Sequence, residues 1–446
     1  MKRRTYLTSA TTVSATLLVA GCTAEQPTED DVDANETDDD SVDDEDEYET
    51  EQDDAEDDDD EDDDDEDDED EDDGDEDEHS DLVGTFDDFE DLDAWEGFIG
   101  SIEANPDAST VGSQSALLQP NEADGQVRVR RELDEPIDVR DVTPGLAMAS
   151  GLQGTVLIQL QDDDGDYVEY SQGIGSGGPF ARHNFGPTRI RGDPDPSEVT
   201  LLQIVRWFGE DVEGEMWVDD FHFVPRVNAG KVMLQFHGGF ETHYTQGLSI
   251  LESYDLPGTV FVPTARIRSD AEADGTRLTI DQLEELDAAG WTIGSYGARG
   301  LHLDSVDPDE LESDVLDPMD WLEDHGYADD GRFFAFPGSR YPNDAYDLVS
   351  EHYDLAFAGQ SPSQGYAGNP HLCSVTPTPD AGDAIDLLDW TAELGGITTI
   401  PFYRLQESET IEALETTASH LSDLVEAGEL DVLTPDEMVS SYVSDE

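Results

Sequence analysis

Lysine is scarce in this chain of 446 residues. Only Lys2 and Lys231 occur among 20 basic residues, whereas Asp and Glu total 113 and the formal net charge is −93. With no basic patch to neutralise phosphates, the composition argues against a nucleic-acid partner. Dense carboxylates with few lysine stems indicate adaptation to molar salt, where the Debye length falls to about 3 Å and self-repulsion is screened. A surface that binds cations or basic partners is the alternative.

The acidity has two parts. Residues 21–80 hold 40 of the acidic residues and no Lys or Arg, while residues 81–446 hold the other 73 against 17 basic residues, a net charge of −56. Low-complexity acidic sequence cannot bury enough apolar surface to fold, so we expect residues 23–80 to be a disordered tether. A specific acidic interaction motif is the alternative.

Cysteine is also rare, and long apolar runs are absent. Cys22 and Cys373 are the only cysteines, so no disulfide framework is expected, and Cys373 is predicted to be a small core or loop residue. The apolar stretch at residues 11–20 is too short to span a bilayer stably and suits an export signal.

The N-terminus shows two further patterns. RRTYL, with Arg3 and Arg4, resembles a twin-arginine signal, and LVAGC resembles a lipobox in which Cys22 is lipidated after cleavage. An ordinary signal with a chance cysteine is the alternative. We interpret residues 1–22 as a lipoprotein signal, which predicts an exported protein anchored to the outer face of the cell membrane.

Residues 81–226 look all-β. Short runs rich in Val, Ile and aromatic residues alternate with Gly, Asp and Pro clusters, as in TVLIQLQD, VTLLQIVRWF and EMWVDDFHFV. This pattern predicts two packed antiparallel sheets. The opening TFDDFEDLDAWEG and the closing GEMWVDDFHFVP resemble the first and last strands of jelly-roll carbohydrate-binding modules. In such modules acidic residues near the two ends often hold a structural calcium, and Glu90 and Asp220 are the matching candidates.

Four aromatic residues of this region are candidates for stacking on sugar rings: Trp95, Trp207, Trp217 and Tyr170. Aromatic side chains are large hydrophobic fillers before they are ligands, so the alternative is that most of them belong to the core. Trp217, which sits in an apolar strand, fits the core best.

Residues 229–446 alternate between strand and helix patterns. Strands are expected at KVMLQF, TVFVP, WTIGS, RFFAFP, DLAFA and ITTIPF, and helices near residues 246–254, 279–290, 308–325, 344–352 and 409–427. In TIDQLEELDAAG, for example, Thr279 is placed to cap a helix that Gly290 ends. Repeated βα units predict parallel strands in a (β/α) barrel.

Residues 231–443 resemble the polysaccharide deacetylase family. KVMLQFHGGF is similar to its first motif, DLPGTVFVP to its second strand, and AAGWTIGSYGARGLHL to the segment with two metal-binding histidines. FFAFPGSRYPN resembles the third motif, ITTIPFYRL the strand that ends in a catalytic histidine, and LTPDEMV the final turn. The resemblance implies a distorted barrel of about seven βα units, in which a divalent metal polarises an acetyl carbonyl and activates water.

The positions that carry this reaction differ from the family pattern. His237 stands at the position of the general base and Tyr403 at that of the general acid. The metal-ligand positions are Gly238, Tyr296 and Gly300. Glycine has no side chain to ligate, and a neutral tyrosine is a poor zinc ligand. The resemblance therefore predicts the frame of a deacetylase without its metal ligands.

A rewired site is the alternative. His237, Glu241, His243 and His302 are metal-capable residues on the loops at the strand ends, although HGGFETH matches no established ligand spacing. Other enzyme classes lack a motif: there is no Gly-x-Ser-x-Gly elbow, phosphate-binding glycine loop or dinucleotide fingerprint. Ser295 in GSYG has no His and Asp partners that the sequence places beside it.

Two functions from different classes follow. The favoured one is a non-catalytic, monomeric cell-surface lipoprotein that binds carbohydrate or envelope glycan, without a catalytic cofactor and with calcium as the only expected ion. The second is an active carbohydrate de-N- or de-O-acetylase that uses a divalent metal held by substitute residues. A structural role in the envelope without a ligand covers the remainder.

Overall fold

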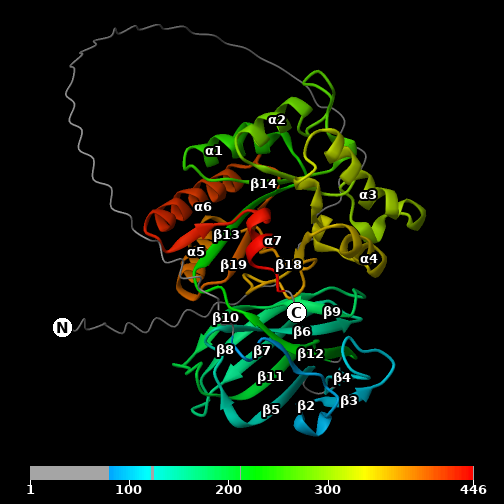
Figure 1. Ribbon diagram of the computed structural model, residues 1–446, viewed down its shortest axis with the longest axis vertical. Coiled ribbons are helices and arrows are strands. Elements are labelled where there is room, and N and C mark those ends of the chain that lie inside the picture. The colour runs from blue at the N-terminus through cyan, green and yellow to red at the C-terminus, as the bar shows by residue number, and fades with distance from the viewer. Residues whose placement is uncertain (1–79, 122–124, 211, 445–446) are drawn as a thin grey trace, which may run out of the picture. The chain divides into compact units, whose positions relative to one another are not determined.

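The computed structural model describes residues 80–121, 125–210 and 212–444 (Figure 1). The predicted signal, Cys22 and the acidic segment up to residue 79 lie outside the described residues. The described residues belong to one compact unit, which comprises a β-sandwich followed by a parallel barrel. Among them, no helix has the length and apolar character needed to cross a membrane.

The sandwich consists of two antiparallel sheets, as the alternating pattern predicts. The first has the strand order β3-β4-β12-β6-β9, with β1 also paired to β12, and the second has the order β10-β8-β7-β11-β5-β2. The strands of the first sheet are β1 (Gly84–Asp87), β3 (Ser101–Asn105), β4 (Ser115–Gln119), β6 (Val142–Ser150), β9 (Ala181–Asn184) and β12 (Met216–Pro225). Those of the second are β2 (Glu96–Ile99), β5 (Gln126–Ile137), β7 (Gly154–Gln161), β8 (Tyr167–Ile174), β10 (Gly186–Arg191) and β11 (Val199–Trp207).

The four aromatic candidates divide between the core and the surface of the sandwich. Trp95 and Tyr170 are buried in the core, with Trp95 stacked on Phe89 at 5.2 Å between ring centroids. Trp217 is only half-buried, contrary to the prediction, because it alternates along β12 with the buried Met216 and Val218. Trp207, at the end of β11, is 56% exposed.

The C-terminal region is a nearly closed parallel barrel, as predicted. Its strands run in the order β18-β17-β16-β15-β14-β13-β19, and β20 also pairs with β13. The strands are β13 (Gly230–His237), β14 (Thr259–Val262), β15 (Thr292–Ser295), β16 (Phe333–Ala335), β17 (Leu355–Gly359), β18 (Cys373–Ser374), β19 (Ile397–Phe402) and β20 (Leu430–Val432). Both faces of a barrel strand are covered, which explains why KVMLQF is mostly apolar and does not alternate strictly between apolar and polar residues. Cys373 is buried in β18, in agreement with the core prediction.

Helices surround the barrel largely where the pattern places them. They are α1 (Ser249–Glu252), α2 (Ile280–Ala288), α3 (Pro308–Asp324), α4 (Asn343–His352), α5 (Ala381–Leu394), α6 (Ser408–Glu426) and α7 (Pro435–Ser441). Thr279 forms a capping box with Gln282 at the start of α2, as predicted. The helix expected at residues 246–254 instead begins as the π-helical segment His243–Leu248 and continues into the short α1. Helix α5 was not predicted.

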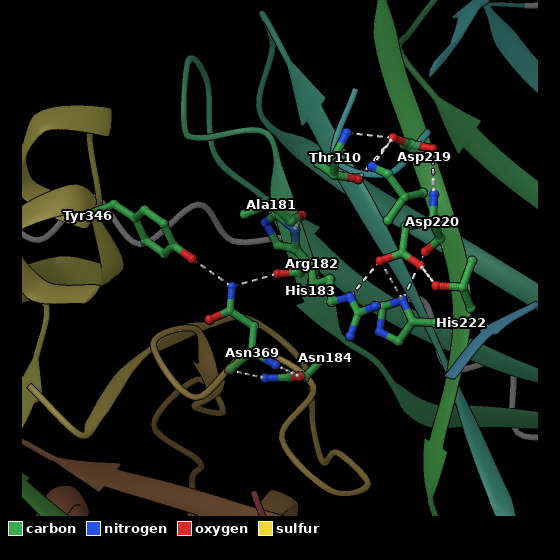
Figure 2. A network of polar contacts seen from close by, with 12 residues as sticks. Thr110, Ala181, Arg182, His183, Asn184, Asp219, Asp220, His222, Tyr346 and Asn369 are labelled. Carbon is green, nitrogen blue, oxygen red and sulfur yellow. Dashed lines mark hydrogen bonds and ion pairs between the residues drawn. The ribbon is translucent and has the colours of Figure 1, made fainter. Parts of the chain in front are cut away.

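A network of hydrogen bonds joins the β-sandwich to the barrel (Figure 2). Asn369, before β18, donates its N–H to Oδ1 of Asn184 at 3.1 Å, and Nδ2 of Asn184 donates to the carbonyl oxygen of Asn369 at 2.8 Å. Nδ2 of Asn369 also donates to the carbonyl oxygen of Arg182 at 2.8 Å and to the hydroxyl of Tyr346 at 3.0 Å. We call this network the junction, together with the neighbouring Asp220 and His222.

Candidate functional site at the barrel mouth

We define the barrel mouth as the residues at the carboxyl ends of β13, β14, β15 and β19. Barrel enzymes carry their active sites at this end of the strands. His237 is the last residue of β13 and only 3% exposed. Its Nε2 donates to Oε1 of Gln235 at 2.8 Å, which leaves Nδ1 as the nitrogen with a lone pair. Burial lowers the pKa of His237 to about 3, and the nearby His243 adds to the shift. The imidazole is therefore neutral and weakly basic at neutral pH.

Aromatic rings enclose His237. The ring centroids of Phe261 and Tyr296 lie 5.4 Å from that of His237, and that of Tyr403 lies at 5.5 Å. Burial raises the pKa of Tyr296 well above its usual value, so this residue is a protonated phenol. Tyr403 is 41% exposed. His237, Tyr296 and Tyr403, which the resemblance assigns to family site positions, thus lie together as an imidazole among aromatic rings.

The two glycines at metal-ligand positions are in the left-handed region, with φ of +94° at Gly238 and +64° at Gly300. A Cβ on Gly238 would lie 3.0 Å from Nη1 of Arg277 and 2.9 Å from Cε2 of Phe240. Nη1 of Arg277 also donates to the carbonyl oxygen of Gly238. A guanidinium therefore fills the space next to the position at which the family carries its metal-binding aspartate.

The residues of the alternative, rewired site have separate partners. Glu241 forms an ion pair with Arg268 at 2.7 Å. His243 is buried and donates from Nε2 to the carbonyl oxygen of Tyr403 at 2.8 Å. His302 lies at the edge of the mouth, with its Nε2 2.7 Å from where a Cβ on Gly338 would stand.

These partners do not bring the four residues together as a ligand set. Within the described ranges, no group of three or more His, Cys, Asp or Glu side chains is placed to hold a metal ion. Ser295 is buried, and its Oγ accepts from the N–H of Gly297 at 3.2 Å and faces the hydroxyl of Tyr353 at 3.5 Å. These contacts give Ser295 a packing role.

The calcium candidates of the sandwich also have separate protein donors. Glu90 accepts from the hydroxyl of Ser113 at 2.8 Å and from the N–H of Gln114 at 3.0 Å. Asp220 is buried and accepts from the hydroxyl of Thr85 at 2.7 Å and from Nε of Arg182 at 2.5 Å. A calcium ion at this position stays a prediction, and the charge of Asp220 is already balanced by an arginine.

Sequence reasoning missed the arginines of the mouth. Arg266 follows β14, Arg404 follows β19, and Arg277 precedes α2. The guanidinium carbons of Arg277 and Arg404 lie 3.9 and 4.7 Å from the ring centroid of Phe240. Their positions in the sequence could have indicated them, because two of these arginines follow barrel strands in a chain that has few basic residues.

One protein-family model and several solved structures are similar to parts of this chain. The polysaccharide deacetylase family model matches residues 225–354. A family 4 carbohydrate esterase from Streptomyces lividans, solved in complex with acetate, is 14% identical and has a TM-score of 0.33, with 46% of this chain and 91% of that chain covered.

Two further solved structures are similar to about a third of this chain each. The family 11 carbohydrate-binding module of a cellulosomal cellulase from Clostridium thermocellum is 14% identical, with 32% of this chain and 94% of that chain covered and a TM-score of 0.26. An exo-β-agarase is 12% identical, with a TM-score of 0.27, and the match covers 33% of this chain and only 26% of that chain. No curated protein matches. Part of the nearly closed parallel barrel, residues 225–354, is therefore similar to the polysaccharide deacetylase family.

Proposed function

We propose that this protein is a non-catalytic glycan-binding protein of the cell surface, exported and anchored through lipidated Cys22. One observation carries the proposal: the barrel keeps the deacetylase frame, while its ligand positions hold Gly238, Gly300 and a protonated Tyr296. The guanidinium of Arg277 stands beside the first of them. Adaptation to high salt and a disordered acidic tether at residues 23–80 belong to the same proposal.

The chemistry of the mouth supports binding over catalysis. A general base works best when its pKa lies near the operating pH, and the pKa of His237 is about 3. Proton abstraction by this imidazole has little driving force. The Tyr296 phenol would have to lose its proton to become a good metal ligand, and burial opposes that ionisation.

The sandwich supports a glycan partner. We assign it to the jelly-roll type, in line with its two antiparallel sheets. Trp207 is 56% exposed and lies on the face of β11 opposite the core residues Leu202 and Ile204. Gln203, on the same face of β11, is buried, and its Nε2 donates to Oε1 of Gln161 at 3.2 Å. An exposed indole offers a flat apolar face on which a sugar ring can stack.

One observation favours the second candidate, an active de-N- or de-O-acetylase with a rewired site. His243 donates from Nε2, and its buried Nδ1 has no hydrogen-bond partner among the described residues. That lone pair, together with Nδ1 of the neighbouring His237, is available to a divalent metal. Zinc sites normally use three or four protein ligands, so a third would have to move into place.

Acetate release separates the two candidates. The purified full chain, in high salt with trace zinc, would be incubated with N-acetylchitooligosaccharides and an O-acetylated glycan, with and without a chelator. We expect no release above the blank, together with measurable binding of a glycan in a separate titration. Chelator-sensitive release that is also lost in His237→Ala would contradict the proposal and establish the deacetylase.

A further inference from the structure

Three arginines gather at the barrel mouth of a strongly acidic protein. Arg277 and Arg404 both lie over the ring of Phe240, at 3.9 and 4.7 Å from guanidinium carbon to centroid. Nη2 of Arg404 donates to Oγ1 of Thr276, next to Arg277 in the chain, at 3.4 Å. Arg266 completes the cluster: its charge and that of Arg404 both act on the Arg277 guanidinium.

No carboxylate neutralises this cluster. Within the described residues, none of the three arginines forms an ion pair, although acidic residues outnumber basic ones 113 to 20 in the sequence. The carboxylate next to the mouth, Glu241, is already bound to Arg268 at 2.7 Å. Other arginines of the same domain, such as Arg299 and Arg332, each contact two carboxylates.

The unneutralised charge persists at neutral pH. Burial, with repulsion from Arg266 and Arg404, lowers the pKa of Arg277 to about 10, which still leaves the guanidinium protonated. Arg277 is half-buried, whereas Arg266 and Arg404 are exposed. Like charges held close together oppose folding, and a bound anion would reduce that cost. Arginine presents its donors as a planar fork that matches the oxygens of a carboxylate or sulfate.

We infer that the barrel mouth binds the oxyanion of an acidic glycan, a sugar carboxylate or sulfate, between Arg277 and Arg404. This inference rests on the proposed glycan-binding function and names its ligand class. The guanidinium of Arg277, beside Gly238, places positive charge where the family frame places a metal. Tyr403, which is 41% exposed, offers a ring face against which the sugar carrying the anion can pack.

The test is a calorimetric titration of the full chain at the lowest KCl concentration that keeps it folded, because salt screens the interaction. The probes are tetragalacturonate, a sulfated tetrasaccharide, neutral chitotetraose and poly-aspartate. We expect one or both acidic oligosaccharides to bind more tightly than chitotetraose and poly-aspartate. The two acidic probes distinguish carboxylate from sulfate.

Matched variants locate the anion. Arg404→Gln, at an exposed position where misfolding is not expected, should weaken binding of the acidic probe about tenfold, and Arg277→Gln should weaken it more. Arg277→Lys keeps the charge without the fork and should recover part of the affinity. Arg140→Gln removes the same charge from an exposed pair with Asp138 in the sandwich and should leave binding unchanged.

The outcomes separate this inference from the proposed function. Equal binding of acidic and neutral probes, or an unchanged affinity in Arg404→Gln, overturns the anion site and leaves glycan binding standing. Poly-aspartate binding as tightly as the acidic sugars also overturns it, because the cluster would then prefer carboxylates of a polypeptide. No binding of any glycan refutes the proposed function as well.

Discussion

The junction and the barrel mouth each hold a poorly exposed arginine near a histidine, but the arginines face opposite surroundings. At the junction, Arg182 donates to Asp220 at 2.5 Å, and the same carboxylate accepts from Thr85 at 2.7 Å (Figure 2). At the mouth, Arg277 faces an aromatic ring and two further arginines. Among the described residues, Arg182 forms an ion pair with a carboxylate, whereas Arg277 does not.

The difference separates a structural role from a binding role. A buried charge that has a partner and hydrogen bonds needs nothing further, and breaking such a pair is costly. Arg277 donates to the carbonyl oxygen of Gly238 but forms no ion pair among the described residues, and a bound anion would supply the counter-charge. We therefore interpret the junction as a structural contact and the barrel mouth as an anion-binding site.

Breaking the pair at the junction should have the largest effect. Asp220→Asn keeps a side chain suited to the positive φ of 44° at this position but removes its negative charge. Because Arg182 then loses its counter-charge, we expect a loss of about 3 kcal/mol in the free energy of unfolding. Chemical denaturation at fixed KCl measures it.

The matched control is Asp138→Asn, which breaks the exposed pair with Arg140 and should cost no more than about 1 kcal/mol. Equal effects of the two substitutions would remove the distinction between a structural joint and an ordinary surface pair.

Acidification should weaken the folded state through histidines in both regions. Burial lowers the pKa to about 4 at His183 and His222 and to about 3 at His237 and His243. Because these pKa values lie below the unfolded value of about 6.5, the unfolded state binds more protons between the two. The stability they contribute is complete above pH 6.5 and is lost progressively as the pH falls toward 4.

Molar KCl is needed for this measurement, because protonation of carboxylates also relieves self-repulsion in so acidic a chain and acts in the opposite direction. The stability of His183→Gln should depend less steeply on pH between 6.5 and 4 than that of the parent chain. Parallel profiles for the two proteins would show that this histidine is not held neutral by burial.

The smallest effect should come from the mouth. Arg404→Gln removes a like-charge neighbour of Arg277 but also an exposed cation–π contact with Phe240. The two contributions oppose one another, so the free energy of unfolding should change by less than about 1 kcal/mol. A loss of unfolding free energy as large as that expected for Asp220→Asn would mean that the arginine cluster stabilises the fold, which would contradict a role in ligand binding.

The barrel could be predicted from the sequence because its elements follow local rules. KVMLQF and ITTIPF are short runs of mostly apolar or β-branched residues that become the buried strands β13 and β19, and Thr279 caps α2 as its spacing requires. The meeting of His237, Tyr296 and Tyr403 followed from the family resemblance.

Other features depend on contacts that no local pattern records. The π-helical segment begins at His243, whose buried imidazole donates to the carbonyl oxygen of Tyr403, 160 residues away in sequence. Trp217 lies in an apolar strand, but the face of β12 on which it falls was set by sheet packing. The arginine cluster joins Arg266, Arg277 and Arg404 from three separate loops, so only the fold brings them together.

Metal content tests the central claim most directly, since we propose that the barrel, whose residues 225–354 match the polysaccharide deacetylase model, does not hold a metal. The full chain would be dialysed in high salt against trace zinc and examined by elemental analysis, beside His237→Ala. The account predicts no stoichiometric transition metal in either protein. One equivalent of zinc in the parent chain that disappears in His237→Ala would contradict it.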